Sequence, residues 1–208
     1  DVEDPEVDEA RGDEAVPLVG GNRPAVVTGV ALQDRLVEPE VDLTGYLILP
    51  GIIDLHAAGI DRIVIGTLAL KAPELVRAAF DDFGPEALTL ALDVRADEQG
   101  QWLCASHGWT ETGLALDAAI ALYIDAGLCH VLCTDIERDG ALGGPNLALY
   151  EEGMRRFPGI DWQASGGVRD AADLAALAKV GVAAAISGKA LLEGRMTEQE
   201  LQPFLRDA

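Results

Sequence analysis

Short apolar runs alternate with longer amphipathic stretches from residue 62 onwards. The apolar runs suit strands buried in a sheet, and the longer stretches have apolar residues at helical spacing. We predict strands at residues 62–65, 88–92, 130–133, 161–164 and 183–186. We predict helices at residues 73–83, 114–127, 146–157 and 171–181. Strands that alternate with helices indicate an α/β fold with a parallel sheet and helices outside it.

The first part of the chain has a different pattern. Residues 1–15 are acidic and nearly free of large apolar side chains, so we expect a disordered tail that buries too little surface to order itself. Residues 16–45 contain short apolar pieces broken by glycine and proline, typical of a small β-rich leader. Residues 46–53 (YLILPGII) are continuously apolar and predict a buried strand, so we assign residues 46–208 to one βα domain.

Charge and cysteine usage narrow the class of protein. The formal net charge of −21 at pH 7 repels nucleic-acid phosphates, which excludes a general DNA or RNA partner. No apolar stretch reaches the roughly 18 residues of a membrane-spanning helix, and we expect no signal peptide. Cys104, Cys129 and Cys133 have no paired spacing, so we expect free thiols and a cytoplasmic location.

Glycines recur where predicted strands end. Residues 59–66 and 181–188 share one spacing, from a glycine through a strand to a second glycine, which indicates two similar sites on one barrel face. Ser165-Gly166-Gly167 and Ser187-Gly188-Lys189 end two successive strands. Glycine lets backbone N–H groups approach an anion, and a helix N-terminus adds partial positive charge. We therefore predict a phosphate site here, the alternative being two ordinary tight turns.

Three further positions are candidates for the mouth of such a site. Asp93 ends an apolar strand, where a carboxylate acts as acid or base, or else caps a helix. Thr134 opens a polar, glycine-rich loop whose carboxylates lack a metal-ligand pattern, so we predict no metal. Trp109, in the long connection after Asp93, either stacks on a heterocycle or packs the loop. His130 lies within a strand and suits a core histidine.

Six sequence blocks carry a family resemblance. They are DRIVIGTLALKAPELV, FGPEALTLALDVR, HGWTETG, HVLCTDIERDGALGGPN, QASGGVRDAADLAAL and ISGKALLEGRMT. In this order, over about residues 57–205, they resemble the ProFAR isomerase family of histidine biosynthesis, whose substrate is an aminoimidazole ribonucleotide with two phosphates. LALDVR and HGW favour this family over the related cyclases. The resemblance implies a partial or distorted (β/α)8 (TIM) barrel after a short β-rich leader.

The resemblance also implies an activity and its residues. The family performs an Amadori rearrangement, an aldose–ketose isomerisation, without metal or organic cofactor. Asp93 matches the general acid, Thr134 a mouth-loop threonine and Trp109 a substrate-stacking position. The partner implied is a small bis-phosphorylated sugar. The positions that match its two phosphate sites are Gly66, Thr67, Ser165, Gly166, Gly167, Ser187, Gly188 and Lys189.

The N-terminal part departs from this family. The family's first strand, with its general-base aspartate, and the next two barrel units are not visible in the sequence. Residues 26–56 instead resemble the leader of amidohydrolases, especially the diphosphatase of phosphonate breakdown, in which PGIIDLH carries a metal-binding histidine. Asp54 either replaces the missing base or is a remnant of that strand.

The strand count leaves two further functions open. Six predicted barrel strands cannot close an eight-stranded barrel, so an open sheet edge would favour self-association. The chain is then an isomerase, a non-catalytic phosphate-binding partial barrel, or a remnant of an amidohydrolase-type metal hydrolase.

Overall fold

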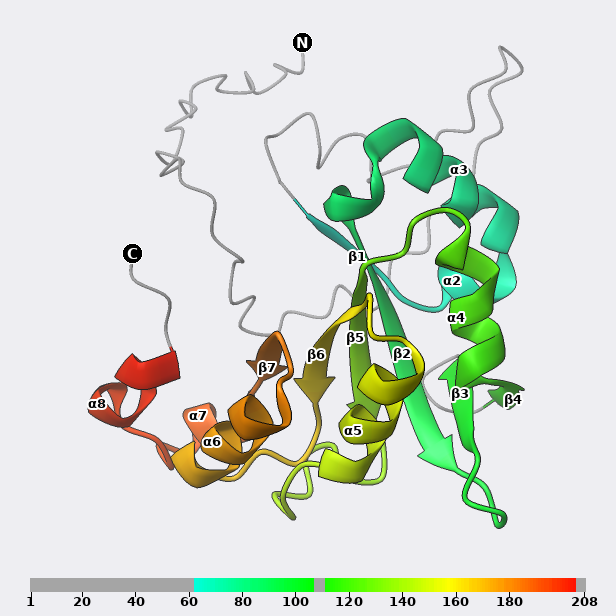
Figure 1. Ribbon diagram of the computed structural model, residues 1–208. Helices are drawn as coiled ribbons and strands as arrows, with labels where there is room; N and C mark the ends of the chain where they lie inside the picture. The colour runs from blue at the N-terminus through cyan, green and yellow to red at the C-terminus, as the bar shows by residue number, and fades with distance from the viewer. Residues whose placement is uncertain (1–61, 107–110, 205–208) are drawn as a thin grey trace, which may run out of the picture.

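A seven-stranded mixed sheet forms the centre of the molecule (Figure 1). The computed structural model describes residues 62–106 and 111–204, so the predicted tail, leader and strand at 46–53 lie outside the described residues. The strands are β1 (Ile63–Ile65), β2 (Leu88–Ala96), β3 (Trp102–Ser106), β4 (Glu111–Ala115), β5 (His130–Asp135), β6 (Asp161–Ser165) and β7 (Ala184–Ile186).

Helices connect the strands and include all four that the sequence predicts. The α-helices are α2 (Leu68–Lys71), α3 (Pro73–Phe83), α4 (Leu116–Ile124), α5 (Leu147–Arg156), α6 (Ala171–Val180), α7 (Lys189–Leu192) and α8 (Glu198–Leu201), with 3-10 turns η1 (Pro85–Ala87) and η2 (Gln202–Phe204). Pro73 begins α3, where its missing N–H costs nothing. Gly181 ends α6 in the left-handed region, as the helix-stop pattern predicts. Among the described residues, no helix is long and apolar enough to cross a membrane.

Five strands are parallel and correspond to the five strands predicted from residue 62 onwards. The sheet order is β4-β3-β2-β5-β6-β7, and β1 also pairs with β2. Strand β2 is long enough for β1 to pair with its first half and β3 with its second half. Helices link β1 to β2, β5 to β6 and β6 to β7, as consecutive βα units require. The α/β expectation is confirmed.

The connection after β2 contains a hairpin that the sequence did not predict. Strands β3 and β4 are antiparallel to each other, and β3 is antiparallel to β2. The turn into β3 is stabilised by Asp97, whose Oδ1 accepts hydrogen bonds from the N–H groups of Gln99 and Gln101. Trp109, in the segment between β3 and β4, lies outside the described residues.

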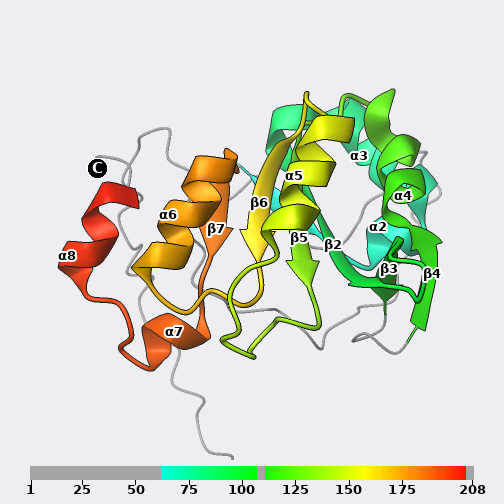
Figure 2. The ribbon, with the colours of Figure 1, turned by 60° about the horizontal axis from the view of Figure 1, so that its bottom comes forward.

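One face of the sheet packs against helices and holds the core. Figures 1 and 2 show α5 and α6 against this face. Leu90, Leu92 and Val94 of β2 are fully or almost fully buried and alternate with residues of the opposite face. Trp162 of β6 and Tyr150 of α5 are the largest buried side chains beside them, together with Tyr123 of α4. Because side chains alternate along a strand, burial of these residues places their neighbours in each strand on the opposite face of the sheet.

Candidate functional site

The C-terminal ends of the parallel strands align three predicted site residues. Asp93 of β2 is in register with Thr134 of β5, and Thr134 is in register with Ser165 of β6. Ser165 is in register with Ile186 of β7, one residue before Ser187. Residues in register on parallel strands direct their side chains to the same face. Asp93, Thr134, Ser165 and Ile186 therefore share the sheet face opposite the helix-covered core, and we call these four positions the strand-end row.

A pocket of about 250 Å³ lies at one end of this row. It unites the ends of β6 and β7 with the loop between β5 and α5. The residues that line it are Asp139, Gly140, Leu142, Gly166, Gly167, Val168, Ile186, Ser187, Gly188 and Lys189. Five of the predicted phosphate-binding residues are in this set, so the two glycine turns form one site.

Gly166 and Gly167 occupy positions that no other residue would fit. Their φ angles are +94° and +86°, in the left-handed region. A Cβ atom on Gly166 would lie 2.7 Å from the Asp135 carbonyl oxygen, and one on Gly167 would lie 2.4 Å from the Gly144 carbonyl oxygen. Both glycines are therefore required by the approach of the β5–α5 loop, whether or not a ligand is bound.

Polar groups in the pocket are suited to an anion. The Ser187 hydroxyl is buried and has no hydrogen-bond partner among the described residues. The Lys189 Nζ atom donates to the Gly140 carbonyl oxygen at 2.8 Å, which places an ammonium group at the rim. Gly188 has open space where a Cβ would lie, so its backbone is accessible from the pocket. Helix α7 has only four residues, so its dipole adds little to these groups.

A buried carboxylate holds the β5–α5 loop over the pocket. Asp135 is 2% exposed, and it accepts hydrogen bonds from Asn146 Nδ2 at 2.6 Å and from the Glu137 N–H at 3.0 Å. Arg138 lies 3.5 Å from the same carboxylate and donates to the Gly144 carbonyl oxygen. The Gly144 N–H in turn donates to the Gly167 carbonyl oxygen. The sequence predicted a loop here, but these contacts between distant residues could not be read from it.

Tyr150 fixes the ends of β5 and β6 from the helix side. Its buried hydroxyl is within hydrogen-bond distance of the carbonyl oxygens of Cys133 and Ser165, and it accepts a hydrogen bond from the Ser165 N–H. Burial raises the pKa of this phenol well above its usual range, so the group stays protonated and keeps its donor. The positions of Thr134 and Ser165 in the row thus depend on α5.

The remaining candidates lie at a distance from the pocket or outside the described residues. Asp93 is two strands from Ser165, or about 10 Å along the sheet at about 4.8 Å per strand. Gly66 and Thr67 follow β1 beside β2, and the Thr67 hydroxyl caps no helix N–H. Asp54 and Trp109 lie outside the described residues, so their predicted roles stay predictions.

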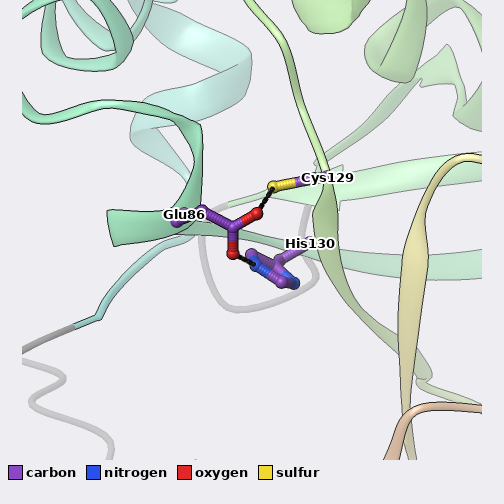
Figure 3. A group of neighbouring side chains, drawn as sticks. All are labelled: Glu86, Cys129 and His130. Carbon is purple, nitrogen blue, oxygen red and sulfur yellow. Dashed lines mark hydrogen bonds and ion pairs between the residues drawn. The ribbon is translucent and has the colours of Figure 1, made fainter. Parts of the chain in front are cut away.

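A second polar cluster lies at the opposite ends of the strands (Figure 3). His130 Nε2 is 2.9 Å from Glu86 Oε2, and Cys129 donates a weak hydrogen bond to Glu86. The hydrogen bond with His130 is the main cause that lowers the Glu86 pKa. Burial is the main cause that raises the pKa of Cys129 to about 11. His130 is buried as predicted, and all three cysteines are free thiols, but nothing in the sequence indicated that Glu86 joins them.

The architecture defines the class of protein. Consecutive parallel βα units with helices outside, and a polar, glycine-rich site at the C-terminal ends of the strands, are those of a (β/α)8-barrel enzyme. A family model described as histidine biosynthesis protein matches residues 50–197, more than half of the chain. The chain belongs to this family, whose members are enzymes of histidine biosynthesis with isomerase or cyclase activity. The match includes residues 50–56, which the sequence had also associated with an amidohydrolase-like leader.

Proposed function

We propose that this chain is an aldose–ketose isomerase that acts on ProFAR in histidine biosynthesis. The observation that carries the proposal is the position of Asp93 in the strand-end row, between the Gly66–Thr67 turn and the glycine-lined pocket. An acid between two anion-binding turns suits a sugar that carries a phosphate at each end. Membership of the histidine biosynthesis family supports the pathway, and the motifs LALDVR and HGW favour the isomerase over the cyclase.

The spacing of the two turns suits a substrate with two phosphates. Gly66 follows β1 and Gly188 follows β7, the outermost of the five parallel strands. Four strand spacings of about 4.8 Å separate them, so the two turns lie about 19 Å apart when measured along the curved sheet. The pocket at Gly188 would hold one phosphate and the turn at Gly66 would hold part of the other. The reacting sugar then lies over Asp93 and Thr134.

The proposed reaction is an acid–base rearrangement. Asp93 donates a proton to the ring oxygen of the aminoaldose, the bond between C1 and that oxygen breaks, and the nitrogen lone pair forms a Schiff base. A carboxylate then removes the C2 proton and the electrons move toward nitrogen to give an enolamine, which becomes the aminoketose. Asp54 remains our candidate for this second carboxylate. Asn146, Asp135 and Tyr150 act indirectly by holding the loop and strand ends in place.

A non-catalytic phosphate-binding partial barrel is the second candidate. The observation in its favour is the asymmetry of the described part of the chain. A glycine-lined pocket is formed at β6 and β7, whereas at the other side of the sheet the Val64 side chain, on the face of the strand-end row, is 50% exposed. Such a protein would bind sugar phosphates through the glycine turns without turning them over.

Turnover of ProFAR by the full chain separates the two candidates. ProFAR is titrated into the protein while the ketose product is followed by chromatography, and binding is measured in parallel by calorimetry. The isomerase proposal predicts saturable ketose formation. Saturable binding without product would support the non-catalytic candidate and reject the isomerase mechanism, and absence of binding would reject both.

A further inference from the structure

Three side chains with different metal-ligand atoms meet where β2 and β5 begin. Glu86 precedes β2 in η1, and Cys129 and His130 lie at the start of β5. Figure 3 shows the carboxylate between the thiol and the imidazole. His130 Nε2 is 2.9 Å from Glu86 Oε2, Cys129 Sγ is 3.8 Å from Glu86 Oε1, and the three ligand atoms lie within 4.8 Å of one another.

These separations are close to those around a tetrahedral zinc ion. Thiolate, imidazole and carboxylate bind zinc at about 2.3, 2.0 and 2.1 Å, so neighbouring ligand atoms lie about 3.3 to 3.6 Å apart. The cluster therefore needs only small side-chain movements to surround an ion. Glu86 has a largely exposed side chain, which gives an ion a path from solvent.

The orientation of His130 is a second, independent observation. Its side chain is 6% exposed, and its Nδ1 atom is buried without a hydrogen-bond partner among the described residues, 3.6 Å from Asp161 Oδ2. When Nε2 binds a metal, Nδ1 carries the proton and faces Asp161, the arrangement that usually orients metal-bound histidines.

We propose that Glu86, Cys129 and His130 bind a divalent cation of the zinc class, with Asp161 as the residue that orients His130. Thr134 lies four residues further along β5 than His130, so this site is about 13 Å from the strand-end row. It is therefore independent of the proposed isomerase site. The ion would tie the segment before β2 to the start of β5, at the barrel end associated with stability.

Local charge is compatible with this site. Glu86 and Asp161 supply negative charge, and Arg62, 3.6 Å from Glu86, offsets part of it. A thiol must lose its proton to bind a cation, so cation affinity should rise with pH and each bound ion should release a proton.

Cobalt titration of the full chain tests the proposal. Protein freed of metal with a chelator is titrated with Co²⁺ under a non-thiol reductant, and the near-ultraviolet thiolate-to-cobalt band is followed. We expect a band that saturates at one ion per chain and that Zn²⁺ displaces. Absence of the band from the wild-type chain would overturn the site.

Matched variants assign the ligands. The band should vanish in Cys129→Ser and persist in Cys104→Ala, whose thiol is buried elsewhere. Glu86→Gln should weaken cobalt affinity at least tenfold, and Asp161→Asn by about 10- to 100-fold, as for other residues that orient metal ligands. Circular dichroism confirms folding of each variant. A band of equal intensity in folded Cys129→Ser, or unchanged affinity in Glu86→Gln, would contradict the proposal.

Discussion

Two glycines of the pocket have different reasons for being glycine. Gly167 has a positive φ and nearly touches the Gly144 carbonyl oxygen, so the fold requires it. Gly188 has an ordinary φ, and a Cβ atom at this position would meet nothing within 4 Å, so folding alone would accept alanine there. A ligand that approaches its backbone is the remaining reason for glycine at this position.

Gly188→Ala therefore separates ligand binding from stability. We expect an unchanged free energy of unfolding and about a tenfold or greater loss of affinity for ribose 5-phosphate, since one charge-assisted hydrogen bond contributes about 1.5–3 kcal/mol. Calorimetric titration and urea denaturation measure the two quantities. Gly159→Ala, which also meets nothing within 4 Å, is the control and should change neither. Equal affinity in Gly188→Ala and wild type would remove this turn from the phosphate site.

The ion pair between Asp173 and Arg169 makes stability depend on pH. Arg169 donates two side-chain hydrogen bonds to the buried Asp173 carboxylate, and these are the main cause that lowers its pKa. A lowered folded-state pKa gives stability that is complete above the unfolded value of about 4 and is lost as pH falls through the folded value. The difference in unfolding free energy between wild type and Asp173→Asn should therefore shrink as the pH falls below about 4. A difference that is constant from neutral pH to the acid limit would contradict this.

At the scale of elements, the Tyr150 hydroxyl joins α5 to β5 and β6 through hydrogen bonds with the backbone of Cys133 and Ser165. Tyr150→Phe leaves the half-buried Ser165 N–H without its tyrosine acceptor, so we expect a loss of about 1–3 kcal/mol in unfolding free energy. Because Ser165 adjoins the pocket, affinity for ribose 5-phosphate should fall as well. Tyr123→Phe is the matched comparison, since its buried hydroxyl donates to the Ala69 carbonyl oxygen, away from the pocket. It should lower stability alone, and a selective loss of binding in Tyr123→Phe instead would be inconsistent with this role.

The elements that could be predicted are those that local pattern determines. The apolar run predicts β5, and Pro73 predicts the start of α3. A polar residue at the end of an apolar run predicts Asp93 and Ser165 as site residues. Strand β3 could not be predicted, because the turn from β2 into it depends on one Asp97 side chain. The Glu86–His130 contact could not be predicted, because it joins residues 44 positions apart through the alignment of two strands. Most of the contacts that the sequence did not predict depend on how distant strands align with one another.

On the scale of the whole molecule, the described sheet has two outer parallel strands. Among the described residues, β1 pairs only with β2, and β7 pairs only with β6. Unpaired strand edges bind further strands readily. We expect self-association of the full chain, measured as a molar mass that rises with concentration in sedimentation equilibrium. A single mass of one chain over the whole concentration range would show that no second copy covers these edges.

The central claim is that Asp93 is the acid of a ProFAR isomerase, and its direct test is ketose formation by wild type and Asp93→Asn. General acid catalysis contributes about 10²- to 10⁴-fold, so the variant should lose at least about a hundredfold in kcat while it still binds ProFAR. Asp125→Asn, at the exposed end of α4, is the control and should retain full activity. Ketose formation at the wild-type rate by Asp93→Asn would contradict the account.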